Sequence, residues 1–206
     1  MTIEAFTTEK ILSDVDRLRY FYRMKNVIRY AKDRKVEMNT ESVAEHIYGM
    51  FLLTQYFLPL EDPEETLNKT RIYELMTVHD FDEIETGDYL SQIKNASHKI
   101  ESEQAFGEVK KHIPPHIQEK VIALIDEYET QETPEAKFAK AIDKVEPLIQ
   151  LFDEDGKTTM HKNKTTAEQS LKVKLGYIES FPFIYKLALT IHQKFIDDGQ
   201  YWTEGS

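Results

Sequence analysis

The residues of this chain with the clearest chemical capacity are two histidines, each next to a carboxylate, and a distant aspartate. His46 follows Glu45, His79 precedes Asp80, and Asp143 lies far downstream. An adjacent histidine and aspartate inside an apolar run are costly to bury unless a charged group lies between them. A divalent cation is the simplest such group, and a mixed set of imidazoles and carboxylates suits Mn, Fe, Co, Ni or Zn.

The spacing of apolar residues places these groups on helices. His46 lies one helical turn from Met50, and His79 lies one turn from Leu75, so both histidines fall on apolar faces. Three helices can therefore direct the two imidazoles and the two aspartates to one point inside a bundle, which is the usual construction of a bundle metal site. The spacing alone leaves an alternative open, in which the histidines are hydrogen-bonded core residues and the distant aspartate is a solvated acid.

Helical periodicity runs through most of the sequence, and strand-like alternation is absent. We therefore expect one all-α domain over residues 1–206, built as a helical bundle. Capping patterns at Ser42, Asp62 and Thr133 locate three of the helix starts. The expected helices cover residues 8–31, 42–59, 62 to just before Gly87, 101–109, 114–128, 133–149, 166–177 and 182–197, with a polar loop around 153–156.

Composition limits the classes of function. The chain has 206 residues, no cysteine and a net charge of −11. Disulfides, thiolate metal sites and a cysteine nucleophile are excluded, and so acidic a chain is a poor match for long nucleic acids, although one small phosphorylated substrate stays compatible. The first residues lack a signal-peptide pattern and no apolar run is long enough to span a membrane, so we expect a cytoplasmic protein without a membrane partner.

Four segments carry a resemblance to a known family. They are residues 41–46 (ESVAEH), 79–88 (HDFDEIETGD), 127–131 (EYETQ) and 136–144 (AKFAKAIDK). The order His, His-Asp, Asp resembles the signature of the HD-domain metal-dependent phosphohydrolases, and the first two segments resemble their 5′-deoxynucleotidase subgroup. The resemblance spans about residues 18–151 and thins beyond, which implies a metal-binding core followed by C-terminal helices over about 165–198.

The resemblance implies a ligand set and a proton-transfer residue. It implies that His46, His79, Asp80 and Asp143 bind one divalent transition metal, whose chemistry makes water nucleophilic near neutral pH. It also implies that Glu83 is the catalytic acid or base. From the residues alone, the favoured interpretation of Glu83 is a solvated acid at a helix end.

The same resemblance implies which residues contact the substrate. Arg29, with Arg34 as the second choice, matches an arginine that binds phosphate in this subgroup. Tyr30 stands where the family often has a tryptophan that helps to select deoxyribose, and this departure leaves the choice of sugar open. Asp88 is expected to act with Glu83 by holding the nucleoside or the water network, and Lys99 lies where relatives use basic residues. The alternatives are a loop or cap residue for the aspartate and an exposed side chain for the lysine.

Together these features predict a phosphomonoesterase that acts on (deoxy)nucleoside 5′-monophosphates. The resemblance also implies a homodimer, with the tyrosine-rich first helix as a candidate interface. Two other functions stay open: a phosphodiesterase or nucleoside-triphosphate hydrolase of the same superfamily, and a metal-stabilised binding protein without catalysis. The former would need more basic residues or further ligands, which are not clearly present, and the intact Glu83 and Asp88 argue against the latter.

Overall fold

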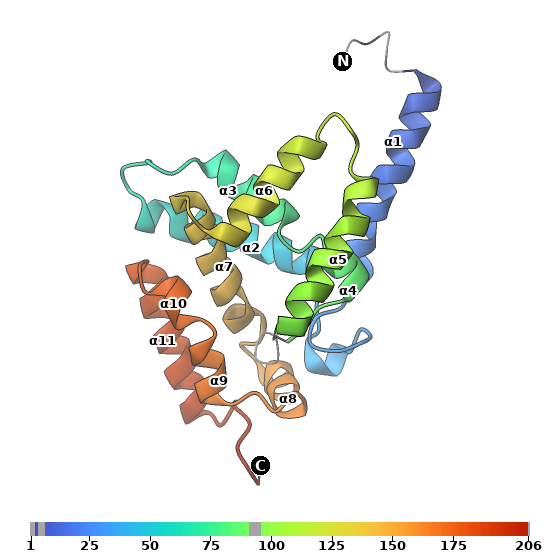
Figure 1. Cartoon of the computed structure of the whole chain (residues 1–206). Helices are drawn as coiled ribbons and strands as arrows, with labels where there is room; N and C mark the ends of the chain where they lie inside the picture. Colours follow the sequence, from blue (N-terminus) through green and yellow to red (C-terminus); the bar gives the residue numbers. More distant parts are fainter. Residues whose placement is uncertain (1–2, 4–6, 91–95, 206) are drawn as a thin grey trace.

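The computed structural model describes residue 3, residues 7–90 and residues 96–205 (Figure 1). Its helices are α1 (Thr8–Phe21), η1 (Tyr22–Asn26), η2 (Val36–Met38), α2 (Val43–Glu61), α3 (Lys69–Val78), α4 (Glu83–Thr86), α5 (Ala96–His112), α6 (Gln118–Thr130), α7 (Pro134–Gln150), α8 (Glu154–Lys162), α9 (Ala167–Lys172), α10 (Leu175–Ile178) and α11 (Pro182–Asp197). The described ranges contain no strand, only one antiparallel bridge between Ile28 and Ser42. The prediction of an all-α fold is confirmed.

Helix α7 is the centre of the bundle, and it packs against α2, α3, α6, α10 and α11. As predicted, Thr133 caps its start by accepting a hydrogen bond from the amide three residues on, and Pro134 occupies the first turn. Phe138 and Ile142 are completely buried on its inner face. Because Asp143 follows directly, the packing that buries this face also carries a carboxylate into the interior.

The first helix is shorter than predicted, since residues 8–31 do not form one element. After α1 and η1 the chain at Val27 and Ile28 is extended and pairs with the segment that precedes α2. The amide of Val43 donates to Val27 O (3.0 Å), and the amide of Arg29 donates to Glu41 O (2.8 Å). β-Branched residues at 27 and 28 are stiff in a helix, and this pairing satisfies the Val27 carbonyl and the Arg29 amide instead.

The predicted helix that starts at Asp62 and continues almost to Gly87 is also wrong. The Asp62 carboxylate accepts hydrogen bonds from the amides of Thr66 (3.0 Å) and Leu67 (2.7 Å), so it closes a loop and does not cap a helix. Helix α3 begins later, where Asn68 provides the cap. It stops at Val78, and α4 is a separate short helix.

The polar segment around residues 153–156 was predicted as a loop, but it opens α8. The Asp153 carboxylate accepts a hydrogen bond from Gly156 N at 2.7 Å, which is a cap that the sequence analysis did not use. Only glycine fits at position 156, because a Cβ there would lie 2.2 Å from Leu151 O. Other boundaries differ less: α2 continues through Pro59, α5 is longer than 101–109, α6 begins at 118, and residues 166–177 form α9 and α10. The helices predicted over 133–149 and 182–197 are confirmed.

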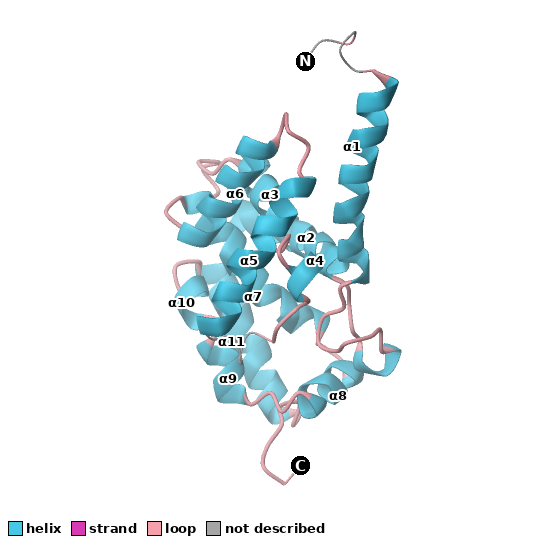
Figure 2. Ribbon diagram, turned by 45° about the vertical axis from the view of Figure 1, so that its right-hand side comes forward, coloured by secondary structure: helices cyan, strands magenta, loops and turns pink. Residues whose placement is uncertain are grey.

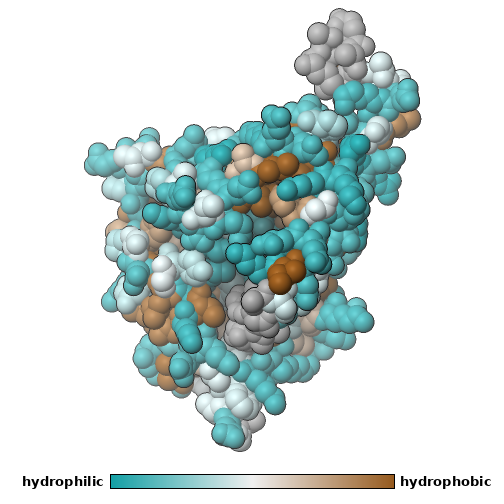
Figure 3. All heavy atoms as spheres, viewed as in Figure 1, coloured by the Kyte–Doolittle hydropathy of each residue, from teal (hydrophilic) through white to brown (hydrophobic). Residues whose placement is uncertain are grey.

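The face of the molecule drawn in Figure 3 is mainly polar. On the face seen in Figure 3, hydrophilic residues predominate and hydrophobic ones form a few separate groups. No helix in the described ranges is both long enough and apolar enough to cross a membrane. Helix α1 projects along one side of the bundle (Figures 1 and 2). The division into a core over residues 18–151 and C-terminal helices over 165–198 stays a prediction, although α10 and α11 both pack on α7.

Candidate metal centre

His46 lies in the first turns of α2 with one ring nitrogen already hydrogen-bonded. The predicted capping box starts this helix, with Ser42 and Glu45 each accepting a hydrogen bond from the backbone amide of the other. The His46 side chain is fully buried, and its Nδ1 lies 2.7 Å from Glu146 Oε2. Gly49 leaves room for this carboxylate, because a Cβ there would lie 2.8 Å from Glu146 Oε1. The carboxylate favours a proton on Nδ1, so the Nε2 lone pair of His46 faces the interior.

His79 is held in the same tautomer by the end of α3. Its Nδ1 lies 2.8 Å from Met76 O, which is the carbonyl that a continued helix would offer to the amide of Asp80. This hydrogen bond is compatible with the end of α3 at Val78, and it places the ring in the core. The Nε2 of His79 then lies 2.9 Å from Asp80 Oδ2. In both histidines Nδ1 is used in a hydrogen bond, and Nε2 faces a carboxylate.

Asp143 approaches the histidines from α7. Its Oδ1 lies 3.3 Å from His46 Nε2, while its Oδ2 accepts a hydrogen bond from Tyr128 Oη (3.2 Å) and lies 2.9 Å from Lys144 Nζ. Burial raises the pKa of a carboxyl group, but the charges of Lys144 and Lys140 and the contact with His46 together outweigh burial and hold the pKa of Asp143 well below its usual range. The carboxylate is therefore ionised and available as a ligand.

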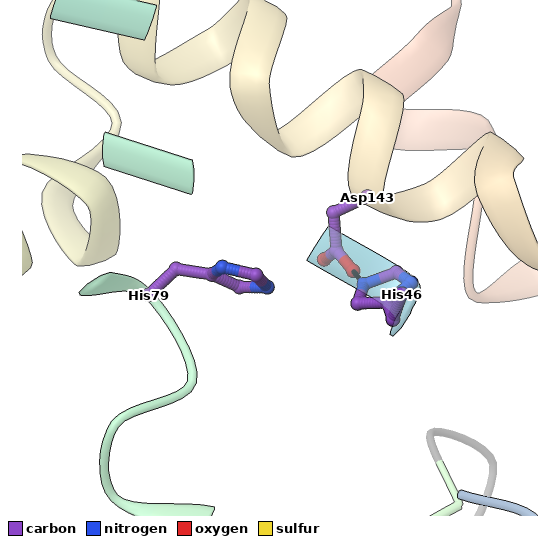
Figure 4. Close-up of side chains that lie close together, drawn as sticks. All are labelled: His46, His79 and Asp143. Atoms are coloured by element: carbon purple, nitrogen blue, oxygen red, sulfur yellow. Dashed lines mark ion pairs between the residues drawn. The ribbon is translucent and has the colours of Figure 1, made fainter. Parts of the chain in front are cut away.

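Three of the four predicted ligands converge. One atom each of His46, His79 and Asp143 lies within 4.8 Å of the others, and Figure 4 shows His79 pointing toward the His46–Asp143 pair. The Nε2 atoms of both histidines are buried and have no hydrogen-bond partner in the described part of the chain. A lone pair that faces a carboxylate is repelled unless a proton or a cation lies between them. Two imidazoles and an ionised carboxylate thus fit a divalent transition metal.

The electrostatics of the site favour positive charge. Burial disfavours a charged imidazole, but the carboxylates of Asp143 and Glu146 outweigh it and raise the pKa of His46 to about 9. A cation can take the place of that proton, because metal binding and deprotonation of a ligand are coupled. Asp80 lies outside the group of three and adjoins it through His79. Burial raises the pKa of Asp80, but the interactions with His79 and the charge of His46 together outweigh burial and lower it.

A second group of charged residues surrounds Arg29; the family motifs gave a role to Arg29 and Asp88 but none to Glu41 or Glu146. Arg29 is buried, and its Nη1 lies 2.9 Å from Glu41 Oε1 and 3.6 Å from Glu146 Oε2, while its Nε lies 3.8 Å from Asp88 Oδ1. These contacts join the predicted phosphate-binding arginine to the carboxylate that holds His46. The one available signal was that Glu146 follows Asp143 by a single turn on the buried face of α7.

Two spaces adjoin at Tyr30 and Asp88. An open hollow of about 510 Å³ is bordered by both residues and by Glu83, whose side chain is buried. An inner cavity of about 80 Å³ is bordered by both residues and also by Arg29 and Asp143. Tyr30 has a φ of 72°, a strained conformation for an aromatic residue of the kind found at functional sites. Several predicted site residues therefore line one continuous region.

Two other predicted substrate contacts lie elsewhere. The Nη1 of Arg34 donates to Thr40 O at 2.9 Å, and its Nη2 lies 2.6 Å from Glu45 Oε2. Lys99 is exposed on α5. Neither residue is among the described residues that border the open hollow or the inner cavity. Arg29 is therefore the better placed of the two candidate arginines.

Comparison with known proteins establishes the family. A family model for the HD domain matches residues 21–183, so this chain belongs to the HD domain family. The fold agrees with a solved structure from Magnetospirillum magnetotacticum described as a predicted metal-dependent phosphohydrolase, with a TM-score of 0.74, 23% identity, and coverage of 94% of this chain and 98% of the other. An HD-domain phosphohydrolase from Listeria innocua has a TM-score of 0.58 at 23% identity, covering 89% of this chain and 85% of the other.

Curated relatives support the predicted subgroup. The chain is 36% identical over 129 residues to 5′-deoxynucleotidase hdd1 of Schizosaccharomyces pombe, which covers 60% of this chain and 63% of that protein. It is 31% identical over 136 residues to 5′-deoxynucleotidase HDDC2 of Homo sapiens, which covers 65% of this chain and 64% of that protein. The match therefore spans less than two thirds of the length of either relative. The resemblance inferred from the sequence motifs is confirmed.

Proposed function

We propose that this chain is a metal-dependent phosphohydrolase that releases phosphate from deoxynucleoside 5′-monophosphates. The observation that carries this proposal is the convergence of the two buried Nε2 lone pairs of His46 and His79 on ionised Asp143. The relatives in fission yeast and human, both named 5′-deoxynucleotidases, support a nucleoside monophosphate as the substrate class.

The resident cofactor in this proposal is one divalent transition metal. His46, His79 and Asp143 would hold it, with Asp80 as the fourth ligand beside His79. When bound, such a metal supplies Lewis-acid chemistry that makes water more acidic and polarises a phosphate oxygen. The nitrogen and oxygen donors are compatible with Mn, Co, Fe, Ni or Zn.

The remaining residues have separate tasks. Arg29 would bind a non-bridging phosphate oxygen with its guanidinium, which its carboxylate neighbours hold in place. Glu83 borders the open hollow and would give a proton to the departing 5′ oxygen as the bond from phosphorus to that oxygen breaks. Asp88 and Tyr30 border both spaces and would contact the sugar.

An activity screen tests the function directly. Purified protein, loaded in turn with each candidate metal, is assayed for release of inorganic phosphate or nucleoside from monophosphates, cyclic nucleotides and triphosphates. We expect hydrolysis of deoxynucleoside 5′-monophosphates, which is lost when the metal is removed by a chelator. Turnover of cyclic nucleotides or triphosphates alone would instead assign a phosphodiesterase or a triphosphate hydrolase, and stoichiometric metal without any turnover would assign a binding protein.

Glu146→Gln is expected to weaken metal binding by about 10- to 100-fold, because it removes the carboxylate that orients His46 and favours its Nδ1 tautomer. The dissociation constant is measured by competition with a metallochromic chelator. Glu135→Gln is the matched control, since this glutamate lies at the opposite end of the same helix. Equal metal affinity in Glu146→Gln and the parent would contradict the positioning role.

We also propose a homodimer that forms through α1. Leu12, Val15 and Leu18 on α1 are 60, 43 and 46% exposed, and Tyr22 at the start of η1 is 67% exposed. Residues 8–21 contain three acidic and three basic side chains, in a chain with a net charge of −11. This helix is therefore a surface on which two copies can meet without strong repulsion, and its apolar residues would gain by burial.

Leu18→Lys is expected to convert the dimer to a monomer of 24.2 kDa, measured by light scattering after size exclusion. The same substitution at Leu52, an exposed leucine on α2, is the control and should leave the dimer intact. A dimer that survives Leu18→Lys, or that dissociates only with Leu52→Lys, would contradict an α1 interface.

A further inference from the structure

Two lysines that border the inner cavity were given no role by the sequence motifs. The cavity is bordered by Arg29 and Asp143 and also by Lys144 and Lys174. Its volume of about 80 Å³ is several times that needed for one water molecule. The same cavity therefore combines a proposed metal ligand, the proposed phosphate-binding arginine and two further cations.

Lys174 differs from the other lysines near the site in its partners. Lys144 Nζ lies 2.9 Å from Asp143 Oδ2, and Lys140 Nζ lies 3.7 Å from the same atom. Lys174 Nζ instead donates to two neutral oxygens, Ser170 O at 3.0 Å and Ser170 Oγ at 3.1 Å. The structure gives it no ion pair with any carboxylate among the described residues, although its side chain is buried.

A buried ammonium with only neutral partners is costly, because burial removes its hydration without supplying an opposite charge. Burial, followed by the charge of Lys144, lowers the pKa of Lys174 to about 8. An ammonium has three donors, and two of them are used on Ser170. One donor and one unbalanced charge are therefore left at the border of the inner cavity.

We propose that Lys174 binds the phosphate group of the substrate and of the inorganic phosphate product, from the inner cavity. This proposal rests on the proposed function and extends it. The phosphoryl group has to lie beside the metal ligands, and Asp143 is the ligand that borders this cavity. The nucleoside would extend past Tyr30 and Asp88 into the open hollow, since these two residues border both spaces.

The proposed phosphate contact of Lys174 also gives the chain beyond residue 151 a role in the site. The sequence motifs end near that position, yet Lys174 reaches the cavity from the turn between α9 and α10. Its position depends on the packing of α10 against α7. The C-terminal helices would therefore supply a substrate contact as well as packing area.

Lys174→Met, which removes the charge and keeps most of the length of the side chain, tests the proposal in the metal-loaded protein. We expect inorganic phosphate to bind about 10- to 100-fold more weakly in calorimetry, as for loss of one hydrogen bond to a charged group. The KM for a deoxynucleoside monophosphate should rise by a similar factor. Metal stoichiometry and the affinity for the nucleoside without phosphate should stay unchanged.

Three further variants separate binding from structure. Lys174→Arg keeps the charge and should restore most of the phosphate affinity. Lys174→Gln keeps a hydrogen-bond donor for Ser170 but not the charge, so it should lose phosphate affinity even if Lys174→Met is poorly folded. Lys172→Met is the matched control on the exposed side of α9 and should bind phosphate as the parent does.

The outcomes distinguish this inference from the proposed function. If Lys174→Met and Lys174→Gln bind inorganic phosphate as tightly as the parent, the phosphate contact is wrong even where the parent hydrolyses nucleotides. If the parent hydrolyses no nucleotide but its phosphate affinity depends on the charge at residue 174, the proposed function is wrong and the anion site is supported.

Discussion

His79→Ala is expected to release the metal and to reduce turnover below detection. The substitution removes one of the two imidazole Nε2 atoms that converge with Asp143 within 4.8 Å. It also leaves ionised Asp80 without its imidazole neighbour at 2.9 Å. Bound metal is measured by elemental analysis after dialysis against buffer that lacks metal, and phosphate release is measured on the same samples.

The control for this variant is His116→Ala, which removes an exposed histidine far from the cluster in sequence. It should retain the full metal content and rate of the parent. Thermal unfolding of His79→Ala and of the parent, both after a chelator has removed the metal, shows whether His79→Ala still folds. A folded His79→Ala protein with a full equivalent of metal would remove His79 from the ligand set and with it the central argument for a metal centre.

Glu83→Ala is expected to retain the metal and to lose about 10²- to 10⁴-fold in kcat, the range for loss of a general acid or base. The side chain is buried at the border of the open hollow, and it is not part of the group of potential ligand atoms formed by His46, His79 and Asp143. Proton transfer should therefore be lost without loss of metal. Steady-state kinetics and metal analysis on one preparation measure both quantities.

Glu85→Ala provides the comparison within the same short helix. Its carboxylate lies 2.8 Å from Arg23 Nη1 and accepts a hydrogen bond from Tyr20 Oη at 3.0 Å. The Glu85 side chain therefore binds residues of α1 and η1. It should change kcat little. Equal rates for Glu83→Ala and the parent would show that another group transfers the proton, whereas loss of metal in Glu83→Ala would assign it to the ligand set.

These two variants separate the two parts of the proposed mechanism. The histidine variant measures whether the cluster of nitrogen and oxygen donors holds a cation. The glutamate variant measures whether a side chain across the hollow moves a proton once the cation is present. If His79→Ala keeps its metal while Glu83→Ala loses turnover, Glu83 still transfers the proton, but the metal is held by a ligand set without His79.

Local patterns in the sequence were sufficient for several helices. The capping box at Ser42, the Thr133–Pro134 start of α7 and the span of α11 all agree with the structure. Each depends on contacts between residues a few positions apart, so the information is local. The same patterns were misleading at Asp62, whose carboxylate closes a loop, because capping and loop closure use the same residue type.

By itself, the sequence determined the fold class, the family motifs and the residues most able to bind a metal. Only the tertiary structure decided that Glu146 would hold His46, a residue 100 positions away, and that Arg29 would leave the predicted helix to join them. It also decided that Lys174 would be buried beside the inner cavity. Periodicity tells which face of a helix is buried, but the partner of a buried polar group depends on how distant helices pack, and that information is not local.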